Sequence, residues 1–80
     1  MNVWGVIFIG LQIGAVFGPL PNAEVCAKVA TEQNYDWAIR RSEGTDLEGN
    51  PLTDEMREMW NGCLFQEERP TTNYVPEAVE

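Results

Sequence analysis

Cys26 and Cys63 offer the most direct chemistry, because they are the two cysteines of an 80-residue chain that has no histidine. Two thiols without a histidine cannot complete the tetrahedral ligand set of a structural zinc ion. A disulfide between them would stabilise the fold by roughly 4 kcal/mol, because it lowers the entropy of the unfolded chain. We therefore expect a disulfide between Cys26 and Cys63, with two unlinked thiols of a reducing compartment as the alternative.

The sequence contains few of the side chains that enzymes use for catalysis. Ser42 is the only serine, and the usual general base, histidine, is absent. The cysteines are also too far apart for a C-x-x-C motif, which makes a thiol redox enzyme the weakest hypothesis. We predict no enzymatic activity, no catalytic residue and no cofactor.

The polar loop of residues 42–51 contains one pattern that is typical of a metal site. Asp46, Glu48 and Asn50 alternate as the first ligands of an EF-hand calcium loop do. Pro51 stands where that loop needs glycine, however, and Arg57 stands where it needs glutamate. We therefore predict no metal site here and interpret the segment as a solvated acidic loop.

The charge of the chain favours a protein partner. The chain has five Lys and Arg residues and 13 Asp and Glu residues, which gives a net charge of −8. The clustered basic residues that phosphate binding requires are absent, so we expect no direct contact with nucleic acid. A basic protein surface is a better partner, and solvation is the alternative role of the acidic residues. The acidic candidates for partner contact are Asp46, Glu48, Asp54, Glu55 and Glu58.

Large apolar side chains form a second set of candidate contacts. They are Trp37, Met56, Met59 and Trp60. Aromatic and methionine side chains often dominate protein interfaces when they are exposed. Ordinary core packing is the alternative, and the commoner, place for them.

Residues 1–20 carry no charged side chain, and localisation depends on what they form. Their β-branched and aromatic residues, and the lack of an initial Lys or Arg, favour two strands over a secretory signal or a membrane anchor. A hairpin would run from about Val3 to Ile9, turn through Gly10, and return from Ile13 to about Phe17. Strands would indicate a cytoplasmic protein, whereas a signal or anchor would place it outside the cytoplasm or in a membrane.

Two helices and a strand are predicted in the remainder. Asn22 can cap a helix that ends by Ser42 or Glu43, and Thr53 can cap a shorter one that Gly62 ends. The buried stripe of the first is expected to comprise Val25, Cys26, Val29, Ala30, Gln33 and Trp37. The apolar side of the second would comprise Leu52, Met56, Met59 and Trp60. The last strand would comprise Cys63, Leu64 and Phe65.

These elements predict an α+β fold. Residues 1–66 would form a small two-layer ββααβ domain with an N-terminal hairpin, one long helix, one short helix and a short last strand. The alternative is a signal or transmembrane helix followed by a disulfide-linked helical hairpin. Residues 67–80 are predicted to be an acidic, flexible tail.

The order of features resembles that of short phage and prophage proteins of unknown function. Those proteins have an apolar N-terminal segment, a proline-containing turn, a helix with one cysteine and a late strand with the other. The matching residues are Phe17, Pro19, Pro21, Asn22, Ala23, Glu24, Val25, Cys26, Gly62, Cys63 and Leu64. The resemblance covers about half of the chain and implies a small accessory protein of phage type.

We therefore expect a non-enzymatic, acidic accessory protein that binds the surface of another protein. The alternative is an exported or single-pass membrane-anchored small subunit, in which residues 1–20 are the signal or the anchor.

Overall fold

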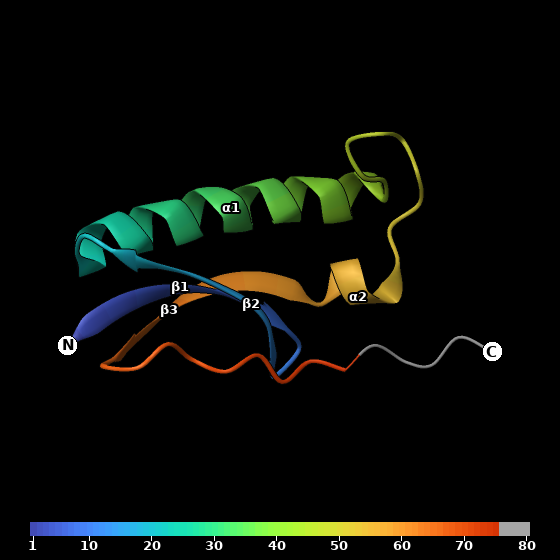
Figure 1. Cartoon of the computed structure of the whole chain (residues 1–80). Helices are drawn as coiled ribbons and strands as arrows, with labels where there is room; N and C mark the ends of the chain where they lie inside the picture. Colours follow the sequence, from blue (N-terminus) through green and yellow to red (C-terminus); the bar gives the residue numbers. More distant parts are fainter. Residues whose placement is uncertain (76–80) are drawn as a thin grey trace.

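The computed structural model describes residues 1–75 and contains, within them, one antiparallel sheet and two helices. The elements are β1 (Asn2–Ile9), β2 (Gln12–Leu20), α1 (Ala23–Glu43), α2 (Asp54–Arg57) and β3 (Met59–Gln66). The strand order is β2-β1-β3, and α1 lies across one face of the sheet (Figure 1). The predicted α+β class and the order of elements are therefore confirmed.

Residues 2–20 form the predicted hairpin. Gly10 and Leu11 make the turn between β1 and β2, and Gly10 adopts a φ of 63°, which glycine reaches without strain. Gly5 of β1 lies opposite Phe17 of β2, and a Cβ at Gly5 would lie 2.1 Å from the Phe17 ring. Strands therefore occupy the segment for which a signal or anchor helix was the alternative. Within residues 1–75, no helix combines the length and the apolar character needed to cross a bilayer.

The buried core lies on the sheet face that points away from α1. Cys63 points towards α1, to which it is bonded, so the neighbouring Leu64 and its cross-strand partner Trp4 point to the opposite face. The core on that face comprises Trp4, Val6 and Val16, packed with Phe8, Ile13 and Leu64. This core needs a cover that α1 does not provide.

Residues 67–75 cover part of this core. The chain turns after β3 and runs back along the sheet face opposite α1 (Figure 1). The Arg69 guanidinium lies 5.9 Å from the centre of the Trp4 ring and donates to the Val16 carbonyl at 2.6 Å. The N–H of Asn73 donates to the Ile13 carbonyl at 2.9 Å. The segment predicted to be a flexible tail thus contacts the sheet as far as it is described. The domain boundary after residue 66 stays a prediction, and residues 76–80 lie outside the described part.

The long helix begins and ends where expected but buries little surface. The Asn22 side-chain oxygen accepts the N–H of Val25 at 2.8 Å, and Gly44 ends the helix in a left-handed conformation. Cys26, which is 1% exposed, is the one fully buried residue of α1. The predicted buried stripe is wrong at Val25 and Gln33, which are exposed.

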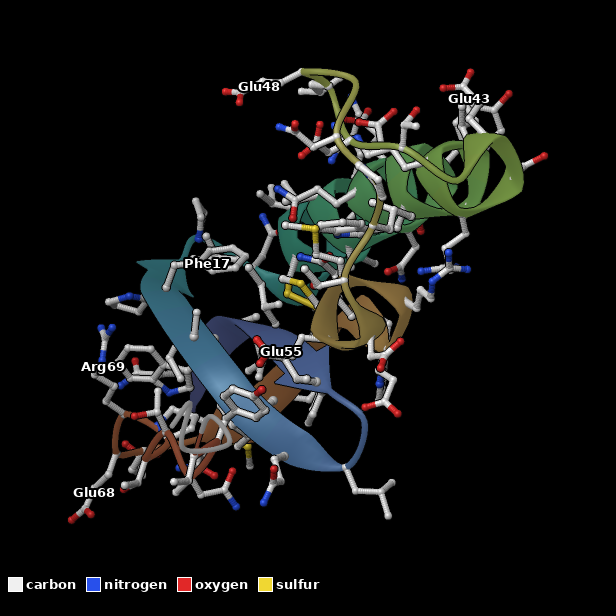
Figure 2. The ribbon with its side chains drawn as sticks, turned by 90° about the vertical axis from the view of Figure 1, so that its right-hand side faces the viewer. Phe17, Glu43, Glu48, Glu55, Glu68 and Arg69 are labelled. Carbon is white, nitrogen blue, oxygen red and sulfur yellow. A yellow bond between two sulfur atoms is a disulfide. The ribbon has the colours of Figure 1, made fainter. Side chains whose placement is uncertain are left out.

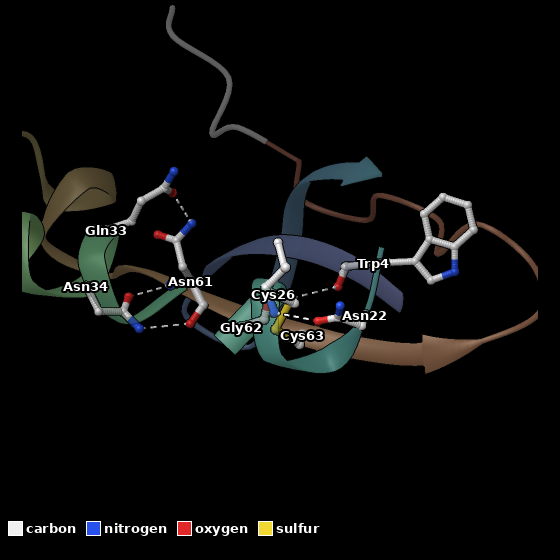
Figure 3. Close-up of a disulfide and its surroundings, with 9 residues drawn as sticks. Trp4, Asn22, Cys26, Gln33, Asn34, Asn61, Gly62 and Cys63 are labelled. Carbon is white, nitrogen blue, oxygen red and sulfur yellow. Dashed lines mark hydrogen bonds between the residues drawn. A yellow bond between two sulfur atoms is a disulfide. The ribbon is translucent and has the colours of Figure 1, made fainter. Parts of the chain in front are cut away.

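A disulfide attaches the first turn of α1 to β3. Cys26 and Cys63 are bonded, with an S–S distance of 2.02 Å, which confirms the predicted pairing (Figure 3). Two turns further along, the side chain of Asn34 pairs with the backbone of Asn61. The helix is therefore held along β3 by local contacts and not by a broad apolar face.

The second helix is shorter than expected, and the last strand is longer. α2 covers Asp54–Arg57 and is capped by the Thr53 hydroxyl, as predicted. Residues expected in that helix, or at its end, belong to β3 instead: Met59, Trp60 and Gly62. The strand is favoured because Trp60 lies opposite Phe8 in β1 and the two rings stack with centres 4.2 Å apart.

Candidate functional site

The turn between β1 and β2 lies against the start of β3. The N–H of Gly10 donates to the Glu58 carbonyl at 3.1 Å, and the indole N–H of Trp60 donates to the Gly10 carbonyl at 3.0 Å. Both bonds connect the hairpin turn to residues that directly follow α2. The acidic residues of α2 are therefore held at the turn end of the sheet.

An acidic cleft opens at this end of the sheet. It has a volume of about 620 Å³ and is lined by Gln12, Thr53, Asp54, Glu55, Glu58, Tyr74 and Val75. The cleft is on the side of the molecule that faces the viewer in Figure 2, where Glu55 is labelled. Its walls come from β2, from α2 with its flanking residues, and from the segment after β3. Only the folded chain therefore brings these residues together.

The carboxylates of the acidic cleft have no cationic partner among residues 1–75. The ion pair found in that range joins the N-terminal ammonium of Met1 to Glu67, with an N–O distance of 3.2 Å. Within the same residues, no group of three or more His, Cys, Asp or Glu is placed to hold a metal ion. Arg57 belongs to the same helix but forms no ion pair with these carboxylates, which outnumber it, so the cleft has a local negative potential.

Exposed apolar side chains occur at the same end of the sheet as the acidic cleft. Leu11, at the hairpin turn, is 96% exposed, and Trp60, bonded to that turn, is 43% exposed. Val75, which lines the cleft, is 77% exposed. Aromatic and other large apolar side chains are typical of the centre of a protein interface, whereas charged side chains are typical of its polar rim.

The other predicted apolar contacts are less accessible. Met56 on α2 and Met59 at the start of β3 are half-buried. Trp37 on α1 is also half-buried, and the Arg40 guanidinium lies 5.1 Å from the centre of its ring. Trp60 is therefore the best placed of the predicted apolar set to meet a partner.

Asp46 and Glu48 lie in the loop between the helices and do not line the acidic cleft. The Asp46 carboxylate accepts the N–H of Asn50 at 2.9 Å and the N–H of Glu48 at 2.8 Å. These donors, chiefly Asn50, hold the pKa of Asp46 below its usual value of 3.8. Asp46 therefore organises the loop, while the exposed Glu48 side chain extends into solvent (Figure 2).

Sequence reasoning placed Asp54, Glu55 and Glu58 among the candidates but missed the residues that complete the cleft. Gln12 comes from a strand edge, and Tyr74 comes from the segment expected to be a free tail. The N–H groups of Asn73 and Tyr74 both donate to the carbonyl of Ile13, which sets this position. No local pattern in residues 67–75 indicates that they return to β2.

The sequence matches no family model, and no curated protein or solved structure is significantly similar to it. The resemblance to short phage and prophage proteins, and the localisation, therefore stay predictions.

Proposed function

We propose that this chain is a non-enzymatic, acidic accessory protein that binds a basic surface of another protein through the acidic cleft. The observation that supports this most is the grouping of Asp54, Glu55 and Glu58 around one cleft, where none of the three forms an ion pair within residues 1–75. A lysine or arginine of the partner would supply the missing charge. Leu11 and Trp60 would contribute apolar contact area beside it.

Electrostatics and apolar contact would have different roles in this complex. The negative potential accelerates the encounter with a basic surface, and its effect weakens as salt screens the charges. The apolar contacts are less sensitive to salt and mainly slow dissociation. The net charge of −8 extends this attraction over the whole chain, so binding at the cleft must be separated from binding to charge in general.

A lysine-rich model peptide provides the test. The peptide is titrated into the full, disulfide-bonded chain at low and at high salt while amide shifts are followed by NMR. We expect the largest shifts at Gln12, the α2 residues and Trp60, and weaker binding at high salt. Binding that does not depend on salt would contradict the proposal.

A charge-matched pair of variants separates the cleft from the net charge. The cleft variant combines Asp54→Asn, Glu55→Gln and Glu58→Gln. The control removes the same charge from exposed positions of α1 through Glu24→Gln, Glu32→Gln and Glu43→Gln. We expect the cleft variant to bind the peptide at least about tenfold more weakly than the control, since it loses charges at the contact itself. Equal weakening would show that only the overall charge matters and would reject the cleft as the binding site.

A further inference from the structure

The outer edge of β3 is protected along one part and open along the other. Asn34 of α1 accepts the N–H of Asn61 at 2.6 Å and donates to its carbonyl at 2.9 Å. Arg41 donates to the Met59 carbonyl at 3.1 Å. Met59 and Asn61 therefore direct their N–H and C=O groups away from β1. Side chains of α1 bond to three of these four groups, namely both groups of Asn61 and the carbonyl of Met59.

Cys63 and Phe65 direct their backbone groups to the same side as Asn61, because alternate residues of a strand share one hydrogen-bonding edge. Within the described residues, no group bonds to the outward N–H or C=O of either residue. The Phe65 side chain beside this edge is 52% exposed. The end of β3 is thus an unpaired strand edge.

The side chains on one face of α1 change from polar to apolar towards the start of the helix. At 100° per residue, Ala27 and Ala30 lie within about 40° of Asn34 around the α1 axis, so all three share one helix face. Asn34 uses this face to cap the strand edge, whereas the alanine methyl groups have no hydrogen-bonding group to offer. β3 itself has no charged residue and no proline, the usual protections of an edge.

We propose that a second copy of this chain pairs with this edge, β3 against β3 in antiparallel orientation about a two-fold axis at Leu64. This register places Cys63 of each copy opposite Phe65 of the other. Each copy offers two N–H and two C=O groups, so the register forms four hydrogen bonds and leaves none of these groups unpaired. Such self-complementarity is what a two-fold interface requires.

The side chains are compatible with this register. Leu64 of each copy would meet its equivalent at the axis, on the sheet face that carries the core. Gly62 would lie opposite Gln66, so no bulky pair is forced together on either side of the axis. The result would be one continuous sheet across both copies, with α1 of each copy on the same face. This interface does not depend on the acidic cleft or on its proposed partner.

The decisive measurements are the mass in solution and the exchange of single amides in the full, disulfide-bonded chain. We expect the mass by sedimentation to rise from one chain towards two as the concentration reaches about 1 mM, the range of small interfaces. The amides of Cys63 and Phe65 should become protected over the same range. High salt should strengthen this association, because each copy carries a charge of −8, whereas salt weakens binding of a basic partner.

Phe65→Pro and Phe65→Ala form a matched pair. Both remove the ring, but only proline removes the outward N–H, which β1 does not use. We expect Phe65→Pro to weaken the dimer about tenfold more than Phe65→Ala, because it loses two hydrogen bonds across the interface.

Ala27→Glu provides a second test without changing the sheet, and Tyr35→Glu, at an exposed position on another side of α1, is its control. Ala27→Glu should weaken the dimer more than Tyr35→Glu.

Several outcomes would overturn the proposal. One is a single-chain mass up to that concentration with rapid exchange at Cys63 and Phe65. Another is a doubled mass while both amides still exchange rapidly, since the copies would then use a different surface. A third is protection that requires an added lysine-rich peptide, which would assign the edge to a strand of another protein.

Discussion

Asn34 binds Asn61 as a neighbouring strand would, because its side-chain amide accepts from the backbone N–H at 2.6 Å and donates to the carbonyl at 2.9 Å (Figure 3). Asn61 is 3% exposed, and its side-chain amide also donates to Gln33. One side chain of α1 thus replaces part of a missing strand and fixes the helix beside the sheet edge.

Replacing Asn34 by alanine should lower the free energy of unfolding by about 2 kcal/mol, because two backbone groups of Asn61 lose their partner. Urea denaturation of the oxidised protein measures the change. Asn34→Asp is the matched control: it keeps an acceptor for the N–H but has no donor for the carbonyl when ionised. An unchanged midpoint in the alanine variant would mean that water replaces the side chain without cost.

Reduction of the Cys26–Cys63 bond should lower the free energy of unfolding by roughly 4 kcal/mol, because the bridge spans 37 residues of the unfolded chain. Urea midpoints with and without a dithiol reductant give this difference, and intact mass after alkylation confirms the redox state. A Cys26→Ala, Cys63→Ala variant that matches the reduced protein would show that free thiols add nothing further. Equal midpoints for the oxidised and reduced chains would show that other contacts alone hold α1.

Acid should disorder the loop around Asp46. Backbone donors lower the pKa of this carboxyl from 3.8, so its contribution to stability is present above that pH and is lost as the pH falls through the native pKa. A carbon-detected NMR titration should place the Asp46 midpoint below 3.8, with faster exchange of the Asn50 and Glu48 amides at lower pH. Asp46→Asn, which keeps an acceptor, should remove the pH dependence. A midpoint at or above the usual value would contradict this role.

Arg69→Ala should loosen the segment after β3, since the guanidinium contacts Trp4 and donates to the Val16 carbonyl. We expect a loss of about 1 kcal/mol in the free energy of unfolding. We also expect faster exchange of the Ile13 amide, whose N–H donates to the side-chain oxygen of Asn73. Arg69→Lys keeps the charge without the planar donor and should be intermediate. If the Ile13 amide is unaffected by Arg69→Ala, the segment is held by Asn73 and Tyr74 alone.

Local chemistry in the sequence determined much of this fold. Gly10 set the hairpin turn, Asn22 and Thr53 capped the helices, and the β-branched N-terminal segment formed strands. Each of these preferences acts over a few residues, so the residue types alone are enough to indicate them.

Tertiary contacts decided the remainder. Trp60 joined β3 and not a helix because Phe8, more than fifty residues earlier, lies opposite it in the sheet. The acidic cleft likewise depends on residues 67–75 returning to β2, where backbone groups of Ile13 were open to them. Such pairings depend on which edges and faces remain uncovered once the sheet has formed. Composition and spacing do not contain that information, because it arises only when distant segments compete for the same surface.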